Sequence, residues 1–124
     1  MTGYSVSVKE SSKELTARER LLLKDLTNAT KLDTACDNAD ITITPVAYAV
    51  LSVHNEKSDN KDYENYIIQD DNGETFTTGS ESFWTTFKDI WEEMKDEKEA
   101  WSIKIYKKAS KNYTGKSFIT CSIV

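Results

Sequence analysis

A tight turn in the middle of the chain constrains the fold more than any other feature of the sequence. Asn72 and Gly73 stand between two β-prone runs, residues 62–70 and 74–79, and both residue types tolerate the positive φ angles of a tight turn. A third β-prone run, residues 41–55, comes before them and is followed by a charged loop of hairpin length. The sequence therefore predicts an antiparallel meander of three strands.

The first of these strands has one irregular position. Alternation places six apolar residues on one face of the run, namely Ile41, Ile43, Ala47, Ala49, Leu51 and Val53. Pro45 interrupts the pattern, because proline cannot donate a hydrogen bond to a neighbouring strand. We expect Pro45 at a sheet edge or a bulge, or else the strand begins after it.

A short helix is expected before the meander. Thr16 and Glu19 match a capping box, in which each side chain accepts a hydrogen bond from the backbone N–H of the other residue. Leucines at helical spacing follow, so the sequence predicts a helical extension at about 15–36 that packs on the core. Residues 1–14 lack a sustained period and are expected to form a flexible arm.

A second helix is expected over residues 81–95. Its apolar residues recur at the spacing of one helix face, and Ser80 stands at the N-cap position. Trp91 lies beside this apolar stripe and Trp101 alternates with isoleucines, so both are expected in the core. Trp84 lies off the stripe, and its role stays open.

The last quarter of the chain differs in charge from the rest. Residues 101–124 contain five lysines and no acidic residue, so they carry +5 in a chain whose net charge is −5. Two alternating runs, at 101–106 and 118–123, flank a loop that is rich in Asn, Ser and Gly. They predict a hairpin with one apolar face and one cationic, aromatic face.

The order of these elements predicts the fold class. A chain of 124 residues with 38% apolar and 30% charged residues suits one globular domain. A three-stranded meander, a helix and a final hairpin follow each other in the order of the five-stranded OB barrel. The prediction is a mainly β fold with helices, an OB-type barrel within a single domain at 15–124. An open antiparallel sheet covered by the helix is the alternative.

Two stretches of the second half also resemble a known family. TTGSESFWTTFKDIWEEM, residues 77–94, and WSIKIYKKASKNYTGKSFITCSIV, residues 101–124, are similar to small OB-fold single-stranded DNA-binding proteins of phages and mobile elements of Gram-positive bacteria. The resemblance covers roughly residues 40–124. It implies sequence-tolerant binding of single-stranded DNA during replication or recombination.

Candidate binding residues follow from the chemistry of single strands, which are held by lysines on phosphates and by aromatic rings stacked on bases. In an OB barrel they come from strands two and three and from two loops, here residues 56–62 and 108–116. The predicted site residues are Lys57, Lys61, Tyr66, Phe76, Lys104, Tyr106, Lys108, Lys111, Tyr113 and Lys116. For Tyr66 and Phe76 a core role is an equal alternative, and the Tyr113 ring has packing on its own loop as its alternative.

The sequence gives no support to catalysis, to a metal site or to a cofactor. His54 is the single histidine, and no cysteine lies near it in the sequence. Gly115-Lys116-Ser117 has the ending of a phosphate-binding loop, but Ser110 stands where that motif needs glycine, and no helix can follow. We therefore expect a non-enzymatic protein without a cofactor.

The expected location is the cytoplasm, of a bacterial host if the protein is phage-encoded. No apolar run approaches the roughly 20 residues that span a bilayer, and the first residues lack the apolar core of a secretory signal. No membrane partner is expected. In a reducing compartment Cys36 and Cys121 are expected as free thiols.

An acidic cluster near the end of the second helix supports an alternative function. It comprises Glu92, Glu93, Asp96, Glu97 and Glu99. Such a cluster is a solvated face, or a docking surface for replication or recombination proteins. The alternative function is a protein-interaction module or phage-encoded inhibitor whose acidic surface mimics nucleic acid. Unpaired edges at the first strand or the final hairpin would also permit a homo-oligomer.

Overall fold

The computed structural model describes residues 3–24, 29–37, 39–57, 61–109 and 117–124. Its elements are β1 (Tyr4–Ser11), α1 (Ala17–Lys24), β2 (Thr30–Lys31), α2 (Leu32–Ala35), β3 (Ile41–Ile43), β4 (Pro45–Asn55), β5 (Asp62–Asp70), β6 (Thr75–Thr78), α3 (Glu81–Met94), β7 (Ile103–Ala109) and β8 (Ser117–Ile123). The prediction of a mainly β fold with helices is confirmed. None of the helices in the described ranges has the length and apolar character needed to cross a membrane.

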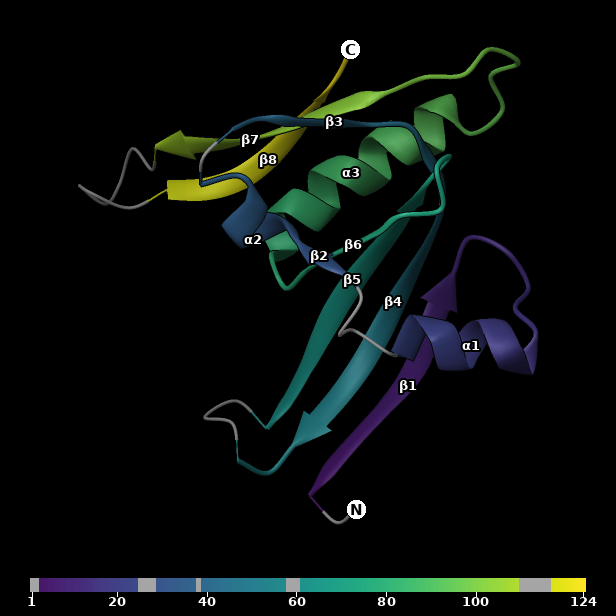
Figure 1. Ribbon diagram of the computed structural model, residues 1–124, viewed down its shortest axis with the longest axis vertical. Coiled ribbons are helices and arrows are strands. Elements are labelled where there is room, and N and C mark those ends of the chain that lie inside the picture. Colours follow the sequence, from purple (N-terminus) through teal and green to yellow (C-terminus); the bar gives the residue numbers. More distant parts are fainter. Residues whose placement is uncertain (1–2, 25–28, 38, 58–60, 110–116) are drawn as a thin grey trace.

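The strands form two sheets, and α3 lies between them (Figure 1). The larger sheet has the order β1-β4-β5-β6-β2, and the smaller sheet has the order β3-β7-β8. A closed barrel would require β6 to pair with β8, and the described strands contain no such pair. The second edge of β6 is taken instead by β2, which pairs with it in parallel. The two sheets are thus not closed into a barrel.

One stretch of chain passes from the smaller sheet to the larger, because β3 and β4 are separated only by Thr44. Pro45 lies at a register shift between β4 and β5, which confirms the bulge that was one expectation for it. The expectation of a single apolar face from Ile41 to Val53 is wrong. Ile43 packs with α3 from the smaller sheet, whereas Val53 lies on the opposite face of the larger sheet.

The hairpin of β5 and β6 is confirmed, with four paired positions around its turn. Gly73 has φ of +83°, but no described residue other than glycine has a positive φ, so Asn72 does not share this conformation. The buried Asp70 carboxylate holds the turn instead. Its Oδ1 accepts hydrogen bonds from the backbone N–H groups of Asn72 and Glu74, both at 3.0 Å.

The first strand corrects the expectation of a flexible arm at residues 1–14. Residues 4–11 form β1, which pairs antiparallel with β4 along seven positions. Val6 and Val8 lie half-buried against an apolar cluster of the larger sheet, while Ser5 and Ser7 are exposed. Valines and serines do alternate in this part of the sequence, but the alternating run is too short to predict a strand, because polar residues follow it directly.

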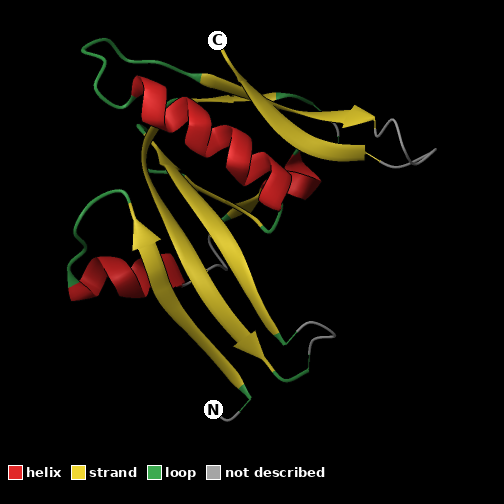
Figure 2. Ribbon diagram, turned by 180° about the vertical axis from the view of Figure 1, so that it is seen from behind, coloured by secondary structure: helices red, strands yellow, loops and turns green. Residues whose placement is uncertain are grey.

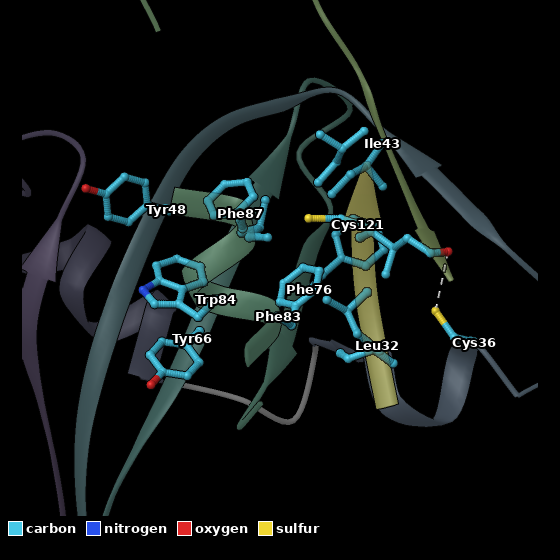
Figure 3. Close-up of a cluster of buried hydrophobic side chains, with 14 of the residues drawn as sticks. Leu32, Cys36, Ile43, Tyr48, Tyr66, Phe76, Phe83, Trp84, Phe87 and Cys121 are labelled. Carbon is cyan, nitrogen blue, oxygen red and sulfur yellow. Dashed lines mark hydrogen bonds between the residues drawn. The ribbon is translucent and has the colours of Figure 1, made fainter. Parts of the chain in front are cut away.

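The main core forms where α3 packs between the sheets (Figure 3). Ser80 Oγ accepts a hydrogen bond from Phe83 N at 3.3 Å, so the predicted helix and its N-cap are confirmed. Phe83 and Phe87 are fully buried, and Trp84 is buried as well. Trp91 and Trp101 are partly buried and pack against this core, as expected.

The predicted helical extension at about 15–36 is helical only in part, because α1 ends at Lys24 and the strand β2 precedes the short helix α2. Helix α1 begins with the predicted capping box but does not pack as expected. Thr16 N donates to Glu19 Oε1 at 3.1 Å, and Glu19 N donates to Thr16 Oγ1 at 3.2 Å. No side chain of this helix is buried, and Leu21 and Leu22 are each 67% exposed. The helix therefore lies on the surface, with Leu23 partly buried against the larger sheet.

Both cysteines are free and buried, in agreement with the expectation of reduced thiols. Cys36 Sγ lies 3.7 Å from the carbonyl oxygen of Ile105, which it can reach as a weak donor (Figure 3). Cys121 lies on the inward face of β8, where burial raises the pKa of its thiol to about 12. Neither thiol has the lowered pKa of a reactive cysteine.

Candidate nucleic-acid interface

The smaller sheet has one face on the core and one face turned away from it. Ile103, Ile105 and Ile119 point inward and are at most 2% exposed. The alternating positions form the outer face, which we define as Thr42, Lys104, Tyr106, Lys108, Phe118, Thr120 and Ser122. Figure 1 shows α2 and α3 on the other side of this sheet. The strand register therefore brings two lysines and two aromatic rings together on a face that none of the described elements covers.

The register also sets which side chains are neighbours. Lys108 is paired with Phe118, and Tyr106 is paired with Thr120 across the β7–β8 ladder. The Tyr106 hydroxyl lies 2.9 Å from Ser122 Oγ, close enough for either to donate, so the ring is tethered to β8. Lys104 Nζ lies 5.8 Å from the centre of the same ring. Phe118 is 39% exposed and lies on the same face as these groups.

Two aspartates on the chain before β3 pair with lysines of β7. Asp40 Oδ2 lies 3.3 Å from Lys104 Nζ, and both side chains are about half exposed. Asp37 forms an ion pair with Lys107, whose position on β7 lies outside the outer face. Exposed ion pairs of this kind contribute at most about 1 kcal/mol, so a phosphate could displace Asp40 from Lys104.

Lys57 and Lys61 lie far from the outer face. They flank residues 58–60 in the connection of β4 and β5, at the opposite end of the molecule from the β7–β8 hairpin (Figure 1). Lys61 Nζ also lies 3.4 Å from Glu56 Oε2, which neutralises part of its charge. Lys57 and Lys61 therefore do not form one surface with the lysines of the outer face.

Tyr66 and Phe76 occupy the core, which was the alternative role for both. Each is 5% exposed and faces α3 from the larger sheet. The Tyr66 ring stacks on Trp84 with 4.7 Å between ring centres and 10° between planes (Figure 3). Burial raises the pKa of the Tyr66 hydroxyl. Neither ring is accessible to a base in this fold.

Lys111, Tyr113 and Lys116 lie outside the described residues. Among the described positions, Phe118 is the binding candidate that was missing from the predicted set. A sequence signal for it existed, because Phe118, Thr120 and Ser122 alternate with the inward Ile119 and Cys121. The sequence alone could not show which of these two series is buried.

A charged cluster lies around His54 at the end of β4. Its Nδ1 is 2.7 Å from Asp62 Oδ1, and its Nε2 is 2.6 Å from Glu56 Oε1. These two hydrogen bonds raise the pKa of His54, with the Asp62 bond contributing most. Within the described ranges no group of three or more His, Cys, Asp or Glu residues could hold a metal ion. The cluster therefore links the end of β4 to the start of β5, beside the loop that joins them.

We expect the imidazole of His54 to titrate above its ordinary value of 6.5. Since the pKa is raised in the folded state, the protonated ring stabilises the hairpin below pH 6.5, and this contribution is lost as pH rises through the folded pKa. An NMR titration of the single histidine measures the midpoint directly. Asp62→Asn should lower that midpoint, and a wild-type midpoint at or below 6.5 would contradict the cluster.

The chain has no match among known proteins: no family model, no curated protein and no solved structure is similar to it. Its function is therefore inferred from the outer face and its chemistry.

Proposed function

We propose that this protein binds single-stranded DNA without catalysis and with little dependence on base sequence. The observation that carries the proposal is the outer face, where Lys104 and Lys108 lie beside Tyr106 and Phe118 and no element of the described ranges covers them. Lysines pair with phosphates, and every base has a flat face that stacks on an aromatic ring, so such a surface holds a single strand regardless of sequence. Replication or recombination of a phage or mobile element, in the cytoplasm of its bacterial host, is the setting we propose.

The strand connections support a relation to the OB barrel. The chain of β3 and β4 pairs with β7 at its start and with β5 along its length, so the first strand of the meander contacts both the second strand and the final hairpin. In a five-stranded OB barrel the first strand pairs in the same way, with the second strand on one edge and the final hairpin on the other. We propose an opened barrel of this type, in which β2 and α2 stand between β6 and β8.

Salt-dependent binding is the first test of the proposal. We expect a labelled dT oligonucleotide to bind with an affinity that falls as salt rises, because each neutralised phosphate releases a counterion. In fluorescence anisotropy titrations, Lys104→Ala/Lys108→Ala should reduce the slope of log affinity against log salt by about 1.4, or about 0.7 for each lysine.

Lys57→Ala/Lys61→Ala is the matched control, because it removes the same charge at the opposite end of the molecule. Equal weakening by both double variants would contradict a site on the outer face. The absence of binding even at low salt would refute the proposal and favour the alternative of an acidic protein-interaction module.

Asp40→Asn should strengthen DNA binding. The substitution removes the carboxylate that lies 3.3 Å from Lys104 Nζ. A phosphate of the DNA then binds this lysine without having to displace an aspartate. We expect an affinity gain of up to about fivefold at low salt, the value of an exposed ion pair. Asp71→Asn removes the same charge from the exposed turn after β5 and serves as the control in the same titration. An equal gain in both variants would show only a change in net charge.

A further inference from the structure

Helix α1 has an apolar surface that its own fold leaves open. Its three consecutive leucines contribute no buried side chain, and two of them are 67% exposed. An isolated helix of eight residues is only marginally stable in water, and leucine side chains that stay exposed do not stabilise it further. Contiguous apolar surface of this kind marks an interaction site on many soluble proteins.

A groove continues this surface toward the larger sheet. Helix α1 and the sheet enclose a cavity of about 260 Å³, lined on its apolar side by Leu15, Leu22, Leu23, Ala47 and Ile67. Leu21 extends the apolar surface beyond the groove. An apolar side chain of a partner could therefore enter the groove while its neighbours rest on α1.

The charges around this surface favour an acidic partner. Helix α1 carries Arg18, Arg20 and Lys24 against the single acidic Glu19. The same chain holds a complementary segment, residues 92–99, with five acidic residues and two lysines. Trp91 and Met94 lie partly exposed beside these acidic side chains. The end of α3 thus has both the charge and the apolar groups that the α1 surface would accept.

The two surfaces lie on opposite sides of the larger sheet within one molecule. Leu23 of α1 packs on one face of the larger sheet with Ile67, whereas α3 packs on the opposite face with Ile68. Figure 2 shows the two helices on either side of this sheet. Because the two surfaces lie on opposite faces of the sheet, one neighbouring copy does not cover both, so their contact is heterologous and extends into a chain of molecules.

We propose that a second copy of this protein docks the end of its α3 on the α1 groove, which gives head-to-tail assembly. Opposite charges on the two surfaces orient the copies, and the exposed leucines supply the apolar contact. On a DNA strand this assembly would make binding cooperative. That consequence rests on the proposed function, whereas the assembly itself does not.

Two charge-reversed variants test the assembly by sedimentation velocity without nucleic acid. Wild-type protein should form larger species as its concentration rises, and salt should weaken them. Arg18→Glu/Arg20→Glu breaks the α1 surface, and Glu93→Lys/Glu97→Lys breaks the α3 surface, so each variant alone should be monomeric. Their equimolar mixture should form a heterocomplex, because each partner keeps one intact surface that fits the other.

A third variant, Leu21→Ser/Leu22→Ser, disrupts the α1 surface without reversing a charge, so it tests the assembly even if a charge reversal disturbs folding. Both leucines are exposed, so this variant should melt like wild type yet remain monomeric. Monomeric wild-type protein at every concentration, or a mixture without a heterocomplex, would overturn the proposal. Assembly that persists in a protein with no affinity for DNA would refute the proposed function and leave this inference intact.

Discussion

Replacing Tyr106 and Phe118 together by alanine is expected to remove most of the affinity for single-stranded DNA. Each aromatic ring that stacks on a base contributes about 1–3 kcal/mol. The double substitution should therefore weaken binding by at least about 30-fold, the equivalent of about 2 kcal/mol. Anisotropy titration with a dT oligonucleotide measures the loss. Both side chains lie on the outer face, so the folded core should be preserved.

Tyr106→Phe is the control for this experiment. It keeps the ring and removes only the hydroxyl that bonds Ser122. We expect its affinity to stay near that of wild type if stacking is what the ring supplies. A double alanine variant that binds as tightly as wild type would exclude the outer face as the binding site, regardless of how the lysine substitutions change the affinity.

Phe87→Ala should have the largest effect on stability. The ring is fully buried on α3, and its centre lies 6.2, 5.0 and 6.0 Å from the ring centres of Tyr48, Trp84 and Trp91. Truncation of a buried phenylalanine costs about 3–5 kcal/mol, because the cavity is only partly filled by its neighbours. A domain of this kind has about 5–15 kcal/mol of stability in total, so urea denaturation should shift to a much lower midpoint.

Leu22→Ala is the matched control, since it removes an aliphatic side chain that is 67% exposed. Its effect on the free energy of unfolding should stay within about 0.5 kcal/mol. Because α3 contributes to the packing of both sheets, Phe87→Ala should unfold in a single transition. Two separate transitions would mean that the sheets do not share one core.

The elements that local chemistry specifies were predictable. The hairpin around Gly73, the N-cap at Ser80 and the capping box of Thr16 and Glu19 each depend on residues within a few positions of one another. The bulge at Pro45 follows from a missing backbone donor, which is again a local property. The strand β1 escaped prediction because its pairing with β4 depends on residues about 40 positions away.

The candidate site was predictable only in part. Lys104 and Tyr106 were identified from alternation and Lys108 as part of the loop at 108–116, whereas the structure places all three on the outer face, with Lys108 on β7. Tyr66 showed the same alternation yet is buried under α3, and only the packing of that helix distinguishes the two cases. Phe118 was missed for the same reason.

Local neighbours along the chain were enough to predict the turn between β5 and β6, the starts of α1 and α3, and the alternating faces of β7 and β8. Which face of each strand is buried depends instead on where α3 packs, and that is a property of the folded molecule. The tertiary structure also decided that β2, rather than β8, takes the second edge of β6 and leaves the barrel open. Choices between distant partners depend on packing energies that no local pattern contains.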